Sequence, residues 1–309
     1  MIGRVIGTGS YVPENYYDNY DLEKFVDTSD SWIRERTGIV RRHIISEEDT
    51  TVTMAWNAAK RALEEAHVEA EEIDLILVAT ISSNVVLPCT ACEVQKRLGA
   101  KNAVCFDLNA ACTGFLFAYN TAQTYLAAGL ATCALVIGAE SLSKIVDWTD
   151  RGTCILFGDG AGAVVLQAQE GKFPGMVSHS NGELGSALCC GSGSDHIHMD
   201  GQAVFKFAVR QVPCCIRELL EKEGVLPEEI AYFILHQANQ RIVEAVARRL
   251  ELPLEKFPMN LQEYGNTSSA SIPILLDELN RAGKLKKGQK LVLAGFGAGL
   301  SWGATLMEW

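Results

Sequence analysis

The chain repeats itself, and this repeat limits the folds open to it more than any other feature. Three pairs of segments align at nearly the same offset: 64–77 with 221–234, 94–98 with 246–250, and 135–139 with 291–295. Similar segments that recur in the same order indicate two copies of one structural unit. The sequence therefore predicts two related halves, 1–168 and 169–309.

Each half alternates helical and strand-like patterns. Segments with helical periodicity, 54–65 and 207–221, alternate with short β-branched runs at 74–80 and 232–235. This alternation is typical of α/β folds in which helices cover mostly parallel sheets. The segment 113–128 is apolar nearly all round, as expected of a helix buried between two sheets. We therefore expect a layered α-β-α-β-α arrangement.

Composition excludes several classes of protein. The 309 residues, 48% of them hydrophobic, can bury a large core, and the net charge of -11 argues against general nucleic-acid binding. No apolar run reaches transmembrane length and the chain begins directly with a strand-like segment, so we expect a cytoplasmic protein without membrane contact. The ten cysteines indicate reduced core residues. Cys89 and Cys92 have metal-ligand or redox spacing, but no second pair follows, and we expect no metal.

One cysteine lies where it can react. Cys112 follows a strand-like run and a tight turn of small residues, and it precedes the apolar segment 113–128. Unpaired N–H groups at a helix start favour thiolate over thiol, which predicts an acidic, reactive sulfur. The alternative is a buried cysteine that acts only as a small hydrophobic residue.

Two polar residues in the second half could join this cysteine. The repeat aligns Cys112 with Asn266 and Ala79 with His236, so pseudo-symmetry would bring these strand ends to one cleft. His236 follows an apolar run, at the carboxyl end of a predicted strand, where open α/β sheets bind ligands. The alternatives are a hydrogen-bonded core histidine at 236 and a helix cap at Asn266.

The motifs, taken together and in order, resemble those of β-ketoacyl-acyl carrier protein synthase III. They are GTGSYVP at 7–13, WIRERTGI at 32–39, NAAC at 109–112, FGDGAGA at 157–163, HQAN at 236–239, GNTSSAS at 265–271 and GFGAGLSWG at 295–303. The resemblance covers the whole chain. It implies a thiolase-like fold of two duplicated halves and a homodimer.

The resemblance also implies a reaction, a decarboxylative Claisen condensation that initiates fatty-acid synthesis. Cys112 would take the acyl group from an acyl-coenzyme A, which is a substrate, so no cofactor is expected. His236 and Asn266 would stabilise the enolate formed when malonyl-acyl carrier protein loses CO2. The backbone N–H groups of Cys112 and Ala298 would form the oxyanion hole.

By the same resemblance, further residues acquire roles. The set expected to bind coenzyme A is Thr28, Trp32, Arg36, Arg151, Gly201 and Asn239, with the adenine between Trp32 and Arg151. The set expected to line the acyl pocket is Ile81, Leu87, Leu142, Phe157, Cys189 and Ile197. The cations expected to dock the acidic carrier protein are Lys206, Arg241, Arg248 and Arg249, which could equally form an ordinary solvated face.

Two positions differ from well-known members of the family. Thr113 stands where alanine is usual, and Leu87 stands where some acetyl-specific members carry phenylalanine. The pocket edge could also come from the other subunit, so acetyl, propionyl and short branched primers all stay open.

Three other functions remain as alternatives. The order of cysteine, histidine and asparagine also occurs in papain-like hydrolases, which are not built from two α/β repeats. A ketosynthase-like subunit that binds carriers without catalysis typically lacks the cysteine. A related enzyme of specialised metabolism would be distinguished by its preferred extender.

Overall fold

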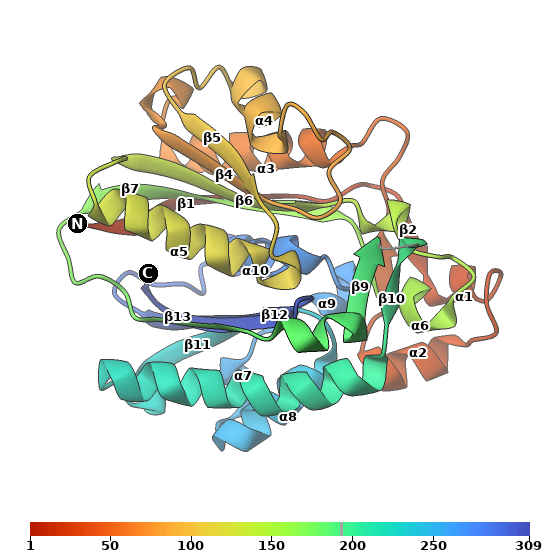
Figure 1. Cartoon of the computed structure of the whole chain (residues 1–309). Helices are drawn as coiled ribbons and strands as arrows, with labels where there is room; N and C mark the ends of the chain where they lie inside the picture. The colour runs from red at the N-terminus through yellow and green to blue at the C-terminus, as the bar shows by residue number, and fades with distance from the viewer. Residues whose placement is uncertain (192–193) are drawn as a thin grey trace.

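Two β-sheets, one from each half of the chain, form the frame of the molecule (Figure 1). This computed structural model describes residues 1–191 and 194–309. The five-stranded sheet has the order β1-β7-β6-β4-β5, with the strands β1 Ile2–Tyr11, β4 Leu75–Ala79, β5 Val104–Leu108, β6 Cys133–Glu140 and β7 Gly160–Gln169. The four-stranded sheet has the order β8-β13-β12-β11, with the strands β8 Met176–Ser180, β11 Ile230–Leu235, β12 Lys290–Gly297 and β13 Ser301–Glu308.

The two sheets share one topology, as the repeat predicts. In the first, β4 and β6 are parallel, while β7 is antiparallel to both β6 and β1. In the second, β11 and β12 are parallel, while β13 is antiparallel to both β12 and β8. The duplication is therefore real. Most strands of each sheet point in the same direction, as expected, but one strand of each sheet, β7 or β13, runs opposite to all the others.

Helices cover both faces of both sheets, which gives the predicted five layers (Figure 1). The outer layers are α3 Thr51–Ala66 with α4 Thr90–Leu98, and α7 Gly201–Glu223 with α8 Gln240–Leu250. The middle layer is α5 Gly114–Ala127 with α10 Ser271–Arg281. Local capping fixes these helices. For example, the Thr50 hydroxyl accepts the N–H of Thr53 at the start of α3.

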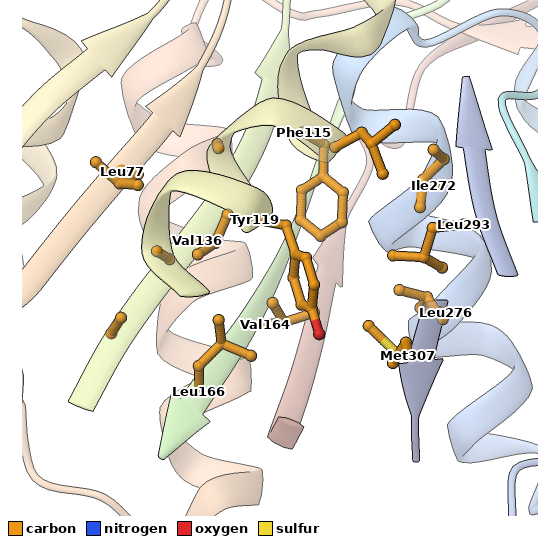
Figure 2. Packing of buried hydrophobic residues seen from close by; sticks show 14 of the residues in the cluster. Leu77, Phe115, Tyr119, Val136, Val164, Leu166, Ile272, Leu276, Leu293 and Met307 are labelled. Carbon is orange, nitrogen blue, oxygen red and sulfur yellow. The ribbon is translucent and has the colours of Figure 1, made fainter. Parts of the chain in front are cut away.

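The middle layer is buried from both sides (Figure 2). Phe115 and Tyr119 of α5 pack in one apolar cluster with Val136 of the first sheet and with Leu293 and Met307 of the second. This burial explains why the segment is apolar nearly all round, as expected. It also places the start of α5 inside the molecule, where a helix terminus is shielded from water.

Smaller elements gather at one end of the two sheets. They are the pair β2 Tyr16–Asp18 and β3 Arg41–His43, the hairpin β9 Leu188–Gly191 and β10 Ser194–Met199, and the short helices α1 Asn19–Leu22, α2 Asp30–Thr37, α6 Arg151–Cys154 and α9 Leu261–Tyr264. Because residues of β9 and β10 face those that follow β4, β5 and β6, they close the edge at which these parallel strands end.

The cysteines are less buried than expected. All ten are free thiols, but only Cys112, Cys133, Cys154 and Cys215 are buried. The others are half-buried or exposed, so the prediction that most of them lie in the core was wrong. Among the described residues, no helix combines the length and apolar character needed to cross a bilayer.

Candidate active site

Cys112 lies in a tight turn between β5 and α5. The turn is a single 3-10 turn, Ala111–Thr113, and Ala111 has a φ of 47°. A residue with a side chain rarely adopts this left-handed conformation, so surrounding contacts must hold it. One such contact is the Thr113 hydroxyl, which donates to the Ala110 carbonyl at 2.6 Å. Cys112 therefore lies at the start of α5, as predicted.

The second half contains the same turn, and it corrects the predicted alignment. The 3-10 turn Ser268–Ala270 precedes α10, and Ser268 has a φ of 50°. Cys112 therefore corresponds to Ser269 rather than to Asn266. The other predicted pair is confirmed, because Gly114, two residues after Cys112, lies against Ala79, and Ser271, two residues after Ser269, contacts His236.

The glycines of the neighbouring strands agree with this match. Gly138, which pairs with Ala79, lies against the Ser269 carbonyl, and Gly295, which follows Ala294, lies against the Cys112 carbonyl. His236 is therefore the counterpart of Ala79, as predicted.

His236 follows β11 and is only 2% exposed. Its Nδ1 lies 2.7 Å from the Ser271 hydroxyl, and that hydroxyl oxygen accepts the N–H of Gln237 at 3.3 Å. The Ser271 proton is therefore free to bond Nδ1, which leaves the ring proton on Nε2. Burial lowers the pKa of His236 to about 3, so the ring is neutral at working pH. It is a hydrogen-bond donor, not a charged group.

Asn266 is held by its backbone and by its amide oxygen. Its N–H donates to the Leu156 carbonyl at 2.8 Å, and its carbonyl accepts the N–H of Gly158 at 3.0 Å. Its Oδ1 accepts the N–H of Ser268 at 2.9 Å. The Nδ2 group is left to donate, so Asn266 both shapes the turn and offers a hydrogen bond.

Cys112, His236 and Asn266 line one cavity of about 560 Å³, together with Phe296 and Gly297. The Phe296 ring stands edge-on to the His236 ring at a centroid distance of 5.4 Å. Cys112 also lines a second cavity of about 600 Å³. Since it borders both, its sulfur lies where a group held in one cavity can meet a group held in the other.

The second cavity contains most of the predicted acyl pocket. Its wall includes Ile81, Leu142, Phe157, Cys189 and Ile197. Leu87 does not belong to this wall, because the loop that carries it turns outward and leaves its side chain 88% exposed. Its assignment to the acyl pocket stays a prediction, which requires that this pocket edge come from the other subunit. The sequence analysis missed Leu188, which borders both cavities.

The first cavity opens among the residues expected to bind coenzyme A. Arg36, Gly201 and Asn239 line it, whereas Thr28, Trp32 and Arg151 lie outside its wall. The guanidinium carbons of Arg36 and Arg151 lie 5.3 and 4.9 Å from the centroid of the Trp32 ring. The contact between Trp32 and Arg151 leaves no room for a base between them, so the expected sandwich requires Arg151 to move.

Burial changes the acidity expected of the nucleophile. It raises the pKa of the Cys112 thiol to about 12, and the Ser268 hydroxyl opposes this rise only in part. The prediction of an acidic thiol was therefore wrong, because removal from water outweighs the favourable helix start.

Glu140 is a functional candidate that the sequence analysis missed. It ends β6, is fully buried, and accepts hydrogen bonds from the Ser82 hydroxyl at 2.5 Å, the Ile81 N–H at 3.1 Å and the Ser269 hydroxyl at 2.9 Å. Its carboxylate thus connects the segment of Ile81 and Ser82, which follows β4, to the turn before α10. A charged residue at the end of an otherwise apolar strand was the available signal.

Comparison with known proteins identifies the family. The model of 3-oxoacyl-[acyl-carrier-protein] synthase III matches residues 106–182, and the model of its C-terminal part matches 220–309. A beta-ketoacyl-[acyl-carrier-protein] synthase III of Clostridium acetobutylicum is 49% identical over 99% of this chain and 98% of that protein. The chain belongs to this family. Synthase III enzymes are thiolase-like acyltransferases whose condensation initiates fatty-acid synthesis, so the predicted reaction class is confirmed.

Solved structures of the synthase III family show the same fold. The 3-oxoacyl-[acyl-carrier-protein] synthase III of Aquifex aeolicus VF5 has a TM-score of 0.96 and 48% identity, covering 99% of this chain and all of that one. The priming β-ketosynthase of the R1128 polyketide pathway has a TM-score of 0.96 and 35% identity, covering 99% of this chain and 96% of that one. The predicted thiolase-like fold is confirmed.

The hydrogen bond between Ser271 and His236 gives a first prediction for this synthase III chain. In Ser271→Ala, the ring loses the partner that keeps its proton on Nε2, and we expect condensation to slow about tenfold, the worth of roughly 1.4 kcal/mol. Acylation of Cys112 should be unchanged, since it does not use the His236 donor. Single-turnover measurement of the two half-reactions checks this. An equal loss of rate in both half-reactions would show that Ser271 supports only the structure.

The raised pKa of Cys112 gives a second prediction. Alkylation by iodoacetamide requires the thiolate, so the rate at Cys112 should rise about tenfold per pH unit from roughly pH 7 to 10 without levelling off. A small thiol with the unperturbed cysteine pKa of ~8.5, such as a short cysteine peptide with both ends blocked, should level off above that pH. Peptide mapping of the alkylated protein gives the rate at each cysteine. A plateau for Cys112 below the small thiol's would contradict the effect of burial.

Proposed function

We propose that the protein condenses a short acyl-coenzyme A with malonyl-acyl carrier protein and holds the acyl group on Cys112. The observation that carries this proposal is the place of Cys112 between two cavities, with His236 and Asn266 on one side only. An acyl chain attached to the sulfur can extend into the cavity of about 600 Å³, while a second thioester approaches from the other. The products are a 3-oxoacyl-acyl carrier protein, CO2 and coenzyme A.

In the first half-reaction, the Cys112 sulfur attacks the thioester carbonyl of acyl-coenzyme A. The carbonyl oxygen becomes negative, and the backbone N–H groups of Cys112 and Ala298 are its proposed donors. A Cβ at Gly297 would lie 2.7 Å from the Cys112 nitrogen, so only glycine lets these two turns approach so closely. The carbon–sulfur bond to coenzyme A then breaks, and coenzyme A leaves as a thiol with the proton that Cys112 gave up.

In the second half-reaction, the malonyl group loses CO2 and its thioester becomes an enolate. The Nε2–H of His236 and the Nδ2–H of Asn266 donate hydrogen bonds to the enolate oxygen. Because both groups are uncharged and buried, they stabilise negative charge as it develops, with little reorganisation. The enolate carbon then attacks the acyl-Cys112 thioester, and the cysteine takes up a proton as it is released.

The proposed coenzyme A site combines cations with a flat aromatic ring. Arg36 and Arg151 flank Trp32, and a phosphorylated adenine nucleotide suits both charge and stacking. The Thr28 hydroxyl is buried without a hydrogen-bond partner among the described residues, so it can bond a ligand. Asn239 has less freedom, because its side chain already bonds the Arg36 carbonyl and the Arg241 N–H.

The proposed carrier-protein surface lies beside the mouth of the same cavity. Lys206 and Arg241 line that mouth, and Arg241, Arg248 and Arg249 of α8 border a shallow groove with Phe205. An acidic carrier would meet these cations although the chain itself is acidic. A carrier docked there can deliver its thioester to Cys112 along the shortest path.

A homodimer is part of the proposal. Strand β5 forms an unpaired edge of the first sheet, and Val104, Val86 and Leu87 are 59%, 88% and 88% exposed. Apolar side chains beside an open strand edge favour pairing with a second copy. In such a dimer, Leu87 could complete the acyl pocket of the partner. We also propose a cytoplasmic location, which the ten free thiols support.

The identity of the extender tests the proposal against its closest alternative. The likeness to the R1128 priming ketosynthase favours a second candidate, a priming step in specialised metabolism. Purified protein should be offered malonyl groups on a fatty-acid carrier, on a polyketide carrier and on coenzyme A. Preference for the fatty-acid carrier supports the proposal, whereas preference for the polyketide carrier supports the second candidate.

A further inference from the structure

A second group of cysteines lies away from Cys112, at the start of α4. Cys89 directly precedes the helix and Cys92 is its third residue, so the two side chains share one face. Their Sγ atoms are 3.5 Å apart. Disulfide-bonded sulfurs are about 2 Å apart, so side-chain rotation over about 1.5 Å joins them. Both residues are half-buried in the single chain.

The start of α4 does not depend on the Cys89 sulfur. The N–H groups of Thr90 and Ala91 each donate to the Asp107 carboxylate at 2.8 Å, from the neighbouring strand β5. The Thr90 hydroxyl also bonds the Ser83 hydroxyl at 2.7 Å. The Cys89 side chain makes no capping bond. A change at this sulfur therefore breaks no contact that holds the helix.

The surrounding groups distinguish the sulfurs from one another. The hydrogen bond with Cys89 and then burial raise the pKa of Cys92. Burial, followed by the nearby Cys92 and Cys89, raises the pKa of Cys105 to about 12, and its thiol donates to the Ala103 carbonyl at 3.5 Å. Cys89 lies before the first turn of α4 and Cys92 lies within it, so we take Cys89 as the sulfur that attacks first and Cys92 as the one that follows.

Two cysteines three residues apart could instead bind a metal ion. Within 1–191 and 194–309, no three cysteine, histidine or acidic side chains are grouped so that they could hold a metal ion. Two sulfurs in contact, with no further ligand, suit a covalent bond between them.

We propose that Cys89 and Cys92 are a reversible dithiol–disulfide site that exchanges with low-molecular-weight disulfides. The Cys89 thiolate attacks one sulfur of the small disulfide, and the other sulfur leaves as a thiolate that takes up a proton. Cys92 then attacks the mixed disulfide at the Cys89 sulfur and releases the second small thiol. In balance, two protein thiols are oxidised to one disulfide, and one small disulfide is reduced to two thiols.

Glutathione disulfide is the probe, and peptide mapping of the intact, folded protein is the readout. In the wild type, the peptide with Cys89 and Cys92 should lose two hydrogens, carry no glutathionyl group, and regain its thiols with dithiothreitol. The exposed Cys214 should gain a glutathionyl group, which shows that the oxidant has acted. In Cys92→Ser, the mixed disulfide should stay on Cys89, because the second attack is lost.

Two further variants complete the test. Cys89→Ser should leave Cys92 reduced, and Cys112→Ala should oxidise at 89–92 like the wild type, which separates this site from acyl transfer. The proposal is overturned if Cys214 is modified while the wild-type pair stays reduced, or if Cys89 keeps its glutathionyl group in the presence of Cys92. A bridge to Cys105 instead would also overturn it.

Discussion

Replacing Cys112 by alanine is expected to abolish acylation by every acyl-coenzyme A. Among the described residues, Cys112 is the only nucleophile that lines both cavities. Its removal leaves no atom to hold the acyl group between the two half-reactions. Loss of a nucleophile typically slows an enzyme about 10⁶-fold, so we expect condensation to fall below detection. Intact-protein mass spectrometry after exposure to acyl-coenzyme A measures the adduct directly.

The control for this experiment comes from the same cavity. Cys189 and Cys190 also line the acyl cavity, and both are exposed. Cys189→Ala and Cys190→Ala should keep the adduct and most of the condensation rate, because neither sulfur faces His236 and Asn266. If the adduct survived Cys112→Ala and disappeared in either of these variants, Cys189 or Cys190 would carry the acyl group, and Cys112 would not.

Changing Asn266 to aspartate should separate the two half-reactions. The substitution keeps an oxygen to accept the Ser268 N–H, so the turn before α10 is preserved, but it removes the Nδ2 donor and places an acid beside the enolate. Loss of one such donor costs roughly 10²- to 10³-fold in rate. We therefore expect acyl-Cys112 to form at nearly the wild-type rate and then to persist when malonyl-acyl carrier protein is added.

A matched asparagine outside the cavity provides the comparison. Asn260 donates to Glu278 at 2.6 Å and does not border either cavity, so Asn260→Asp should discharge the acyl group normally. Rapid-quench measurement of acyl-enzyme decay follows both variants. If Asn266→Asp condensed as fast as the wild type, or lost acylation as severely as condensation, Asn266 would not be an enolate donor.

The repeat carried much of the fold prediction. Alternating patterns at a constant offset identified the duplicated halves, and the apolar character of 113–128 placed that helix in the middle layer, where Phe115 and Tyr119 now contact both sheets. Strand direction was not predictable in the same way. A hydrophobic run has the same composition whether its neighbour is parallel or antiparallel, so the one antiparallel strand of each sheet, β7 and β13, was missed.

The residue-by-residue correspondence between the two halves was harder to predict. An alignment counts residues, whereas the structure matches conformations, and the positive φ values of Ala111 and Ser268 show which residues correspond. The prediction of an acidic Cys112 thiol failed for a related reason. A helix start is visible in sequence, but the depth at which it is buried depends on both sheets together, and that burial decides the pKa.

Hydrogen bonding set the remaining details of the site. The motifs named His236 and Asn266, but only the contacts with Ser271 and Ser268 show that Nε2 of His236 and Nδ2 of Asn266 are left to donate. Glu140 was missed because its partners, Ser82 and Ser269, come from opposite halves of the chain. The exposure of Leu87 was not predictable, because it depends on the path of a loop.

We propose that Cys112 carries an acyl group from coenzyme A to a malonyl-derived carbon. The most direct test is to expose the protein to a panel of acetyl-, propionyl- and branched acyl-coenzyme A esters, record its intact mass, and then add malonyl-acyl carrier protein. The account predicts one acyl mass on Cys112 that disappears as 3-oxoacyl-acyl carrier protein forms. The absence of any adduct, or an adduct that malonyl-acyl carrier protein leaves in place, would contradict it.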